Sequence, residues 1–181
     1  EVDPLSIDLH QRKTWYPITV SSKEEATWHA HRMIEIAPDS PEGYRTVGVQ
    51  EWTLNGRIDE SIPWYSRAMK IDPKRPGTPL VIGVAYAELG DPDMALAYFD
   101  LVKALTSPDN EPVQDRLLVE QAIVGLVSGR TDVHQVAELL LPLIPGGSWS
   151  HDLAMRLAVF VYLATGRPED ALARMEVFSP D

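Results

Sequence analysis

Residues 76–108 read PGTPLVIGVAYAELGDPDMALAYFDLVKALTSP, and this stretch decides the fold. Shifted by 34 residues, it aligns with residues 42–74, which read EGYRTVGVQEWTLNGRIDESIPWYSRAMKIDPK. The aligned pairs are Trp52 and Tyr86, Gly56 and Gly90, Ser61 and Ala95, and Tyr65 and Phe99. A fixed period of this length indicates an array of structural repeats.

Each copy has the pattern of a helix, a tight turn and a second helix. A run with helical spacing of apolar residues ends at Gly56 or Gly90, and a second run begins at Asp59 or Pro92. We call the first helix of each pair helix A and the second helix B.

The second copy shows the helix-capping residues most clearly. Thr78 is suited to cap helix A, Pro79 to occupy its first position, and Gly90 to end it in a left-handed conformation. Gly83 lies in the middle of this helix, where glycine costs about 1 kcal/mol relative to alanine. We therefore expect helix B to approach closely there, with Phe99 beside Gly83.

At these residues the sequence resembles the tetratricopeptide repeat (TPR) family. That family has a small residue and an aromatic in helix A, glycine at the turn, and two small residues around an aromatic in helix B. Its helix B is followed by proline. The matching residues of the second copy are Gly83, Tyr86, Gly90, Ala95, Phe99 and Pro108. Those of the first copy are Trp52, Gly56, Tyr65, Ala68 and Pro73, while Gly48 is one position out of register.

The same pattern extends over the rest of the chain. The resemblance implies an all-α fold, a right-handed TPR-like superhelix (α-α solenoid) of about four helix pairs. We expect a single array over residues 1–181, with approximate repeats at 4–38, 41–73, 76–108, 111–142 and 150–178. Pro63 lies one turn into a helix B, so we expect a late start or a slight kink there.

Composition excludes several classes of function. The chain has 181 residues, no cysteine and a net charge of −11. Each third of the sequence is net negative, which argues against nucleic acid as a partner of this segment. The longest apolar run, residues 153–164, contains Arg156 and is too short to cross a bilayer, so we expect no membrane insertion.

No motif indicates catalysis, a cofactor or a metal. His29 and His31 are two residues apart, so on a helix they point to different faces and make a poor metal pair. Ser150 and His151 lie in a stretch without the strand and elbow of a hydrolase nucleophile, and helix capping is the better interpretation of Ser150. We expect the aromatics of the helices to form the core; they are Trp28, Trp52, Trp64, Tyr86 and Phe99.

The resemblance also implies a partner-binding face. In TPR arrays, helix A residues beside the core stripe line the concave side of the superhelix. At those positions stand Thr46, Gln50, Thr53, Leu80, Val84, Ala87, Arg156, Phe160 and Leu163. Trp149, in a polar glycine-rich loop, is either a further contact residue or is buried by the last helix pair.

These observations favour a non-catalytic protein-protein interaction module that binds a protein or peptide segment. Residues 5–38 also resemble the start of the TPR regions attached to bacterial class III nucleotide cyclases and winged-helix regulators. The chain opens with Glu1 rather than Met, so we expect a piece of a longer protein or a processed mature one. The resemblance implies a regulatory or scaffolding region of a larger bacterial protein, and we expect it in the cytoplasm. The alternatives are a homodimerisation module, a small-ligand-sensing regulatory domain, and a periplasmic or secreted location.

Overall fold

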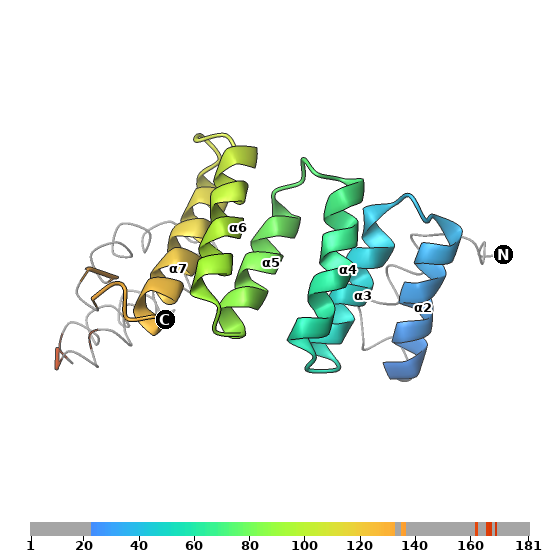
Figure 1. Ribbon diagram of the computed structural model, residues 1–181, viewed down its shortest axis with the longest axis horizontal. Helices are drawn as coiled ribbons and strands as arrows, with labels where there is room; N and C mark the ends of the chain where they lie inside the picture. Colours follow the sequence, from blue (N-terminus) through green and yellow to red (C-terminus); the bar gives the residue numbers. More distant parts are fainter. Residues whose placement is uncertain (1–22, 133–134, 137–161, 163–165, 168, 170–181) are drawn as a thin grey trace, which may run out of the picture. The chain divides into compact units, whose positions relative to one another are not determined.

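The computed structural model describes residues 23–132, 135–136, 162, 166–167 and 169. The chain divides into two compact units, Glu1–Asp91 and Pro92–Asp181, and each is described by itself. All regular structure in the described residues is helical, as the sequence predicts (Figure 1). The fold is therefore all-α in this part of the chain.

The first unit contains four described helices in sequential contact. They are α2 (Lys23–Ile36), α3 (Pro41–Thr53), α4 (Ile58–Ile71) and α5 (Gly77–Glu88). Helix α3 packs against both α2 and α4, and α4 also packs against α5 (Figure 1). Helices α3 and α5 correspond to helix A of the two copies, and α4 corresponds to helix B of the first.

Helices α2 and α3 form where the sequence supplies an apolar stripe and a cap. Ala26, Ala30 and Met33 recur at helical spacing on α2 and are all buried. Helix α3 begins with Pro41 at its first turn, and the Ser40 hydroxyl accepts a hydrogen bond from the Glu42 backbone N–H at 3.4 Å. The start of α3 therefore follows from local sequence.

Two expected helix starts differ from the structure. Helix α4 begins at Ile58 and continues through Pro63, so a late start is wrong, and the slight kink that was the alternative stays a prediction. Helix α5 begins at Gly77, two residues before the expected Pro79. Thr78 is therefore buried within the first helical turn and makes no capping hydrogen bond.

The second unit contains α6 (Pro92–Leu105) and α7 (Glu111–Val127), which pack against each other. Ala95, Phe99 and Val102 form the buried stripe of α6. On α7, Glu120 is buried and pairs with Arg116 four residues earlier. Burial lowers the pKa of Arg116, and the Glu120 carboxylate opposes that shift.

Glycines in the left-handed conformation end the helices as predicted. Gly56, Gly90, Gly129 and Gly166 all have positive φ, between 67° and 80°. After Gly90, the Asp91 N–H donates to the Tyr86 carbonyl at 2.9 Å, which satisfies one of the last carbonyls of α5. Helix A of each copy therefore stops for the same stereochemical reason.

The turn between α3 and α4 is one residue longer than the turn between α5 and α6. Residues 54–57 separate the first two helices, whereas residues 89–91 separate the second two. Gly90 directly follows Leu89, the C-cap residue of α5. In the first copy Asn55 lies between Leu54, the C-cap residue of α3, and Gly56. The first copy thus carries an extra residue at its turn, and this residue changes the register of helix A.

The aromatic core is smaller than the sequence suggests. Phe99 and Tyr65 are buried, and for Phe99 this confirms the prediction; the packing of Phe99 against Gly83 stays a prediction. Trp28, however, is 58% exposed, so its assignment to the core is wrong. Trp28 lies on the side of α2 opposite the buried Met33, because the two differ by five residues on a helix.

Candidate protein-binding surface

Burial fixes the register of α3 relative to α5. On α5 the buried residues are Thr78, Pro79, Ile82, Gly83 and Ala85. An offset of 35 residues places four of these on the buried residues Gly43, Val47, Gly48 and Gln50 of α3, whereas an offset of 34 places only one on a buried residue. Helix A of the first copy is therefore aligned at 35 residues.

Contact between Gly48 and Tyr65 explains this register. A Cβ atom on Gly48 would lie 3.0 Å from Tyr65 Cζ, so α3 approaches α4 closely at this glycine. Gly48 thus occupies the place that the repeat pattern gives to Gly83. The extra residue in the following turn restores the 34-residue offset for α4.

Two of the expected groove residues are consequently buried. Thr46 and Gln50 are 2% and 3% exposed, and Gln50 Nε2 donates a hydrogen bond of 2.8 Å to the Ala26 carbonyl of α2. They were expected to line an open face, but a one-residue shift turns a helical side chain by about 100°. Both residues therefore belong to the buried side of α3, and Gln50 joins α3 to α2.

The remaining expected residues of the first unit are more accessible. Thr53 is exposed, and its hydroxyl donates to the Val49 carbonyl at 2.8 Å. Leu80, Val84 and Ala87 are half-buried and share one face of α5, because they recur at intervals of four and three residues. Trp149, Arg156, Phe160 and Leu163 lie outside the described residues.

Aligning α3 at the observed register identifies the residues that correspond to this α5 face. They are Arg45, Val49 and Trp52, and all three are half-buried. We call the six residues Arg45, Val49, Trp52, Leu80, Val84 and Ala87 the A-helix strip. On α3 the strip lies on a different side from Gly43, which meets Ile34 of α2, and runs beside Gly48, which meets Tyr65 of α4.

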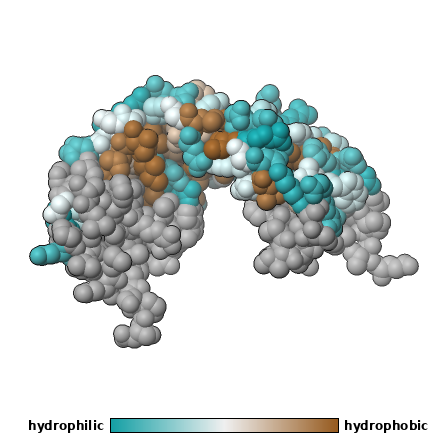
Figure 2. Space-filling model, turned by 90° about the horizontal axis from the view of Figure 1, so that it is seen from below, coloured by the Kyte–Doolittle hydropathy of each residue, from teal (hydrophilic) through white to brown (hydrophobic). Residues whose placement is uncertain are grey.

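The three α3 members of the strip were missed in the sequence, although one signal points to them. Gly48 stands one position out of register, and aligning it with Gly83 gives Arg45, Val49 and Trp52 directly. Trp52 was instead expected in the core. In Figure 2, apolar residues lie in patches between hydrophilic ones on the face that is seen, so apolar surface is not confined to the interior.

Charge gathers at the Arg45 end of the strip. Glu42 accepts from two guanidinium groups, that of Arg45 at 3.2 Å and that of Arg75. Burial first, and then the nearby Arg75, lower the pKa of Arg45, while Glu42 acts in the opposite direction. One end of the strip on α3 is therefore cationic, and Val49 and Trp52 continue it as an apolar surface.

Histidine and carboxylate side chains are dispersed over the described part of the chain. There, no group of three or more His, Asp or Glu side chains is placed to hold a metal ion. His29 is buried and lies 3.6 Å from Glu25, whereas His31 is exposed on a different side of α2. No helix among the described residues is both long and apolar enough to span a membrane.

Solved structures share this helical arrangement along most of the chain. YrrB, a TPR protein with an unusual peptide-binding site, is 14% identical, with a TM-score of 0.58 over 96% of this chain and 85% of its own. The chain has a TPR fold. The Cut9 and Hcn1 complex of the APC/C matches this TPR arrangement with a TM-score of 0.74, at 17% identity over 96% of this chain and 33% of its own.

A third similar structure is a chaperone bound to a peptide. The type III secretion chaperone SycD of Yersinia enterocolitica, in complex with a peptide of the translocator YopD, is 15% identical. Its TM-score is 0.59 over 70% of this chain and 99% of its own. No protein-family model and no curated protein matches this chain in sequence.

Proposed function

We propose that this protein is a TPR interaction module that binds an extended segment of a partner protein along the A-helix strip, on the concave face of the array. The observation that carries the proposal is the strip itself. Val49, Trp52, Leu80 and Val84 are sizeable apolar side chains on the sides of α3 and α5 that the buried residues leave open.

The composition of the strip suits a protein partner. Tryptophan and arginine are enriched among the residues that contribute most to protein-protein binding, and apolar residues around them exclude water. Arg45 and Trp52 provide these two residue types on α3. They are seven residues apart, which is about two turns, and so lie on the same face of the helix. An apolar segment with an acidic residue at the Arg45 end would match this pattern.

Similar structures support binding of a segment rather than catalysis. SycD is bound to a peptide of YopD, and YrrB has a peptide-binding site. By analogy, the module has no catalytic activity of its own and acts as a regulatory or scaffolding region of a larger bacterial protein. A small-ligand sensor would instead need convergent polar groups, and the strip offers mostly apolar ones.

Selection of peptides on the wild-type protein tests the site. Peptides from a displayed library that bind the wild type should lose binding to a Val49→Asp, Val84→Asp double variant. A Leu101→Asp variant is the matched control, because Leu101 is a partly exposed apolar residue of α6 outside the strip. Circular dichroism must show that all three proteins keep the same helicity.

Two results would contradict the proposal. If the selected peptides bind the double variant as tightly as the wild type, the strip is not the binding surface. If the wild type is a dimer by sedimentation and the double variant is a monomer, the strip joins two copies, which is the homodimerisation alternative.

A further inference from the structure

A cluster of aromatic rings and cations lies across α2, α3 and α4 of the first unit. The His31 ring lies 5.8 Å from the Trp64 ring in an edge-to-face arrangement, and Trp64 lies 6.4 Å from Tyr44. The Arg67 guanidinium stands 5.8 Å above the centroid of the Tyr44 ring, within the range of a cation-π contact. We call His31, Tyr44, Trp64 and Arg67 the aromatic-cation cluster.

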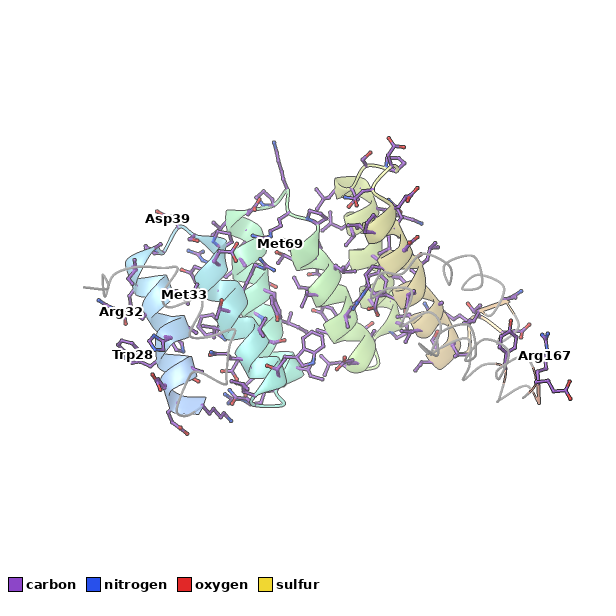
Figure 3. The ribbon with its side chains drawn as sticks, turned by 180° about the vertical axis from the view of Figure 1, so that it is seen from behind. Trp28, Arg32, Met33, Asp39, Met69 and Arg167 are labelled. Carbon is purple, nitrogen blue, oxygen red and sulfur yellow. The ribbon has the colours of Figure 1, made fainter. Side chains whose placement is uncertain are left out.

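This cluster is accessible to a partner. His31 and Arg67 are exposed, and Tyr44 and Trp64 are half-buried. The exposed Trp28 lies one helical turn before His31, and its ring contacts His29 edge-to-face with the centroids 4.9 Å apart. Figure 3 shows Trp28 projecting from α2 away from α3, opposite to Met33. The rings of the cluster and Trp28 thus form a run of aromatic surface.

Cations beside these rings lack carboxylate partners. Within the described residues of the first unit, Arg32, Arg45, Arg57 and Arg75 each pair with a glutamate. Arg67, Lys70 and Lys74 have no such carboxylate in the same part of the chain. The dipole of α4 accounts for Lys70 in the last turn, but Arg67 lies a turn earlier and stacks on Tyr44.

We propose that the aromatic-cation cluster binds an acidic protein segment that carries an aromatic side chain. The carboxylates of the segment pair with Arg67 and Lys70, and its aromatic ring packs against His31 and Trp64. The cluster differs from the A-helix strip, because the two share no residue and the cluster joins α2 and α4 through Tyr44 of α3. The inference therefore goes beyond the proposed function and does not need it.

Charge selects an acidic protein segment over nucleic acid. The whole chain carries −11, and Glu35 and Glu60 are exposed on the same helices as the cluster. A long polyanion would meet this repulsion along its length, whereas a short acidic segment needs only the local cations.

The test uses a fluorescein-labelled peptide of glutamate and tyrosine, and an analogue with glutamine in place of glutamate. Fluorescence anisotropy should show binding of the acidic peptide to the wild type. The affinity for the analogue should be lower by about tenfold or more. Arg67→Glu should weaken binding of the acidic peptide by about tenfold or more. Lys103→Glu is the matched control, since Lys103 is an exposed cation of α6 and the charge change is the same. It should leave the affinity within about twofold of the wild type.

Four results would overturn the inference. The first is that the acidic peptide does not bind the wild type, and the second is that Arg67→Glu and Lys103→Glu lower its affinity equally. The third is that an oligothymidylate binds the wild type more tightly than the acidic peptide does. The fourth is that the wild type is a dimer and Arg67→Glu dissociates it. A Val84→Asp variant should bind the acidic peptide as the wild type does. Failure of the A-helix strip as a binding site would therefore leave this result unchanged, and the two proposals are separated.

Discussion

Gly48 of α3 lies against the ring of Tyr65 of α4, so that a Cβ atom at position 48 would approach three ring carbons at 3.0 to 3.1 Å. This separation is shorter than ordinary van der Waals contact, and the buried Tyr65 ring has little space to move. The close approach of the two helices therefore depends on the absence of a side chain at position 48.

Gly48→Leu should lower the free energy of unfolding by about 1 to 3 kcal/mol or more, because the new side chain overpacks the contact with Tyr65. Gly77→Ala is the control. A Cβ atom there meets nothing within 4 Å, and the helical position should make the change neutral or stabilising by about 0.4 to 1 kcal/mol. Urea denaturation measures both, and equal stability of Gly48→Leu and the wild type would disprove the contact.

Phe99→Ala should destabilise the protein by about 3 to 5 kcal/mol, since Phe99 is fully buried and its removal leaves a cavity. Leu101→Ala, two residues later on α6 and 37% exposed, should cost less than about 1 kcal/mol. Thermal unfolding followed by circular dichroism compares the two variants. Similar melting temperatures for both would mean that the buried stripe of α6 is misassigned.

Much of this fold follows from local sequence signals. The bounds of α6 and the glycine that ends α5 agree with the pattern because Pro92 and Gly90 restrict the backbone directly. Helix α7 ends before Gly129 for the same reason. Such signals depend on a few neighbouring residues, so they can be identified without knowledge of the tertiary structure.

The register of α3 has two conflicting signals in the sequence, and Gly48 aligned with Gly83 supports an offset of 35. The glycine pairs Gly56 and Gly90 support an offset of 34, and only tertiary contact shows that Gly48, not Val49, faces Tyr65. The same limit applies to Trp28. Its helical position is compatible with burial by a neighbour, but the structure leaves it 58% exposed. Two of the six expected A-helix residues in the described part of the chain, Thr46 and Gln50, are consequently buried.

Gln50→Glu should destabilise the protein by about 3 kcal/mol or more at pH 7. The carboxylate would be buried beside the Ala26 carbonyl and could not donate the hydrogen bond that Gln50 Nε2 makes. Burial raises the pKa of such a carboxyl above about 4.3, and the protonated form can donate to the carbonyl. The loss in free energy of unfolding relative to the wild type should therefore be smallest below about pH 4.3. It should grow as the pH rises through the folded-state pKa of the new carboxyl group.

Gln50→Met provides the matched comparison. It removes the amide donor together with Gln50 Oε1, which has no hydrogen-bond partner in the described structure. Loss of both polar atoms with similar volume should cost less than about 1.5 kcal/mol and show no added pH dependence. Chemical denaturation at several pH values measures both variants. A pH-independent deficit for Gln50→Glu would show that position 50 is solvated.

Tyr65 should make stability fall in strongly alkaline solution. Burial raises the pKa of Tyr65 from 10.0 to about 12, although Arg45 acts in the opposite direction. Below pH 10 the phenol is protonated in both the folded and unfolded states. Between pH 10 and about 12 it ionises first in the unfolded state, so the stabilisation is lost as pH rises.

The size of this loss is roughly 2 to 3 kcal/mol, from about 1.4 kcal/mol for each pKa unit. Tyr65→Phe keeps the ring and removes the ionisable group, so its stability should depend less on pH over the same interval. Urea denaturation of both proteins at about pH 9 and about pH 11.5 gives the comparison. Identical pH dependence would contradict the shifted pKa.

The longer turn at residues 54–57 bears on how such a protein could be redesigned. The turn at Gly90 is one residue shorter, which would suggest deleting Asn55 to match it. That deletion would either shift α4 along α3 or force α3 to rotate by about 100°. Rotation would bring Thr46 and Gln50 towards solvent and Val49 towards Tyr65. A hybrid array made by exchanging repeats should therefore transfer α3 together with its own turn, because the two form one unit of exchange.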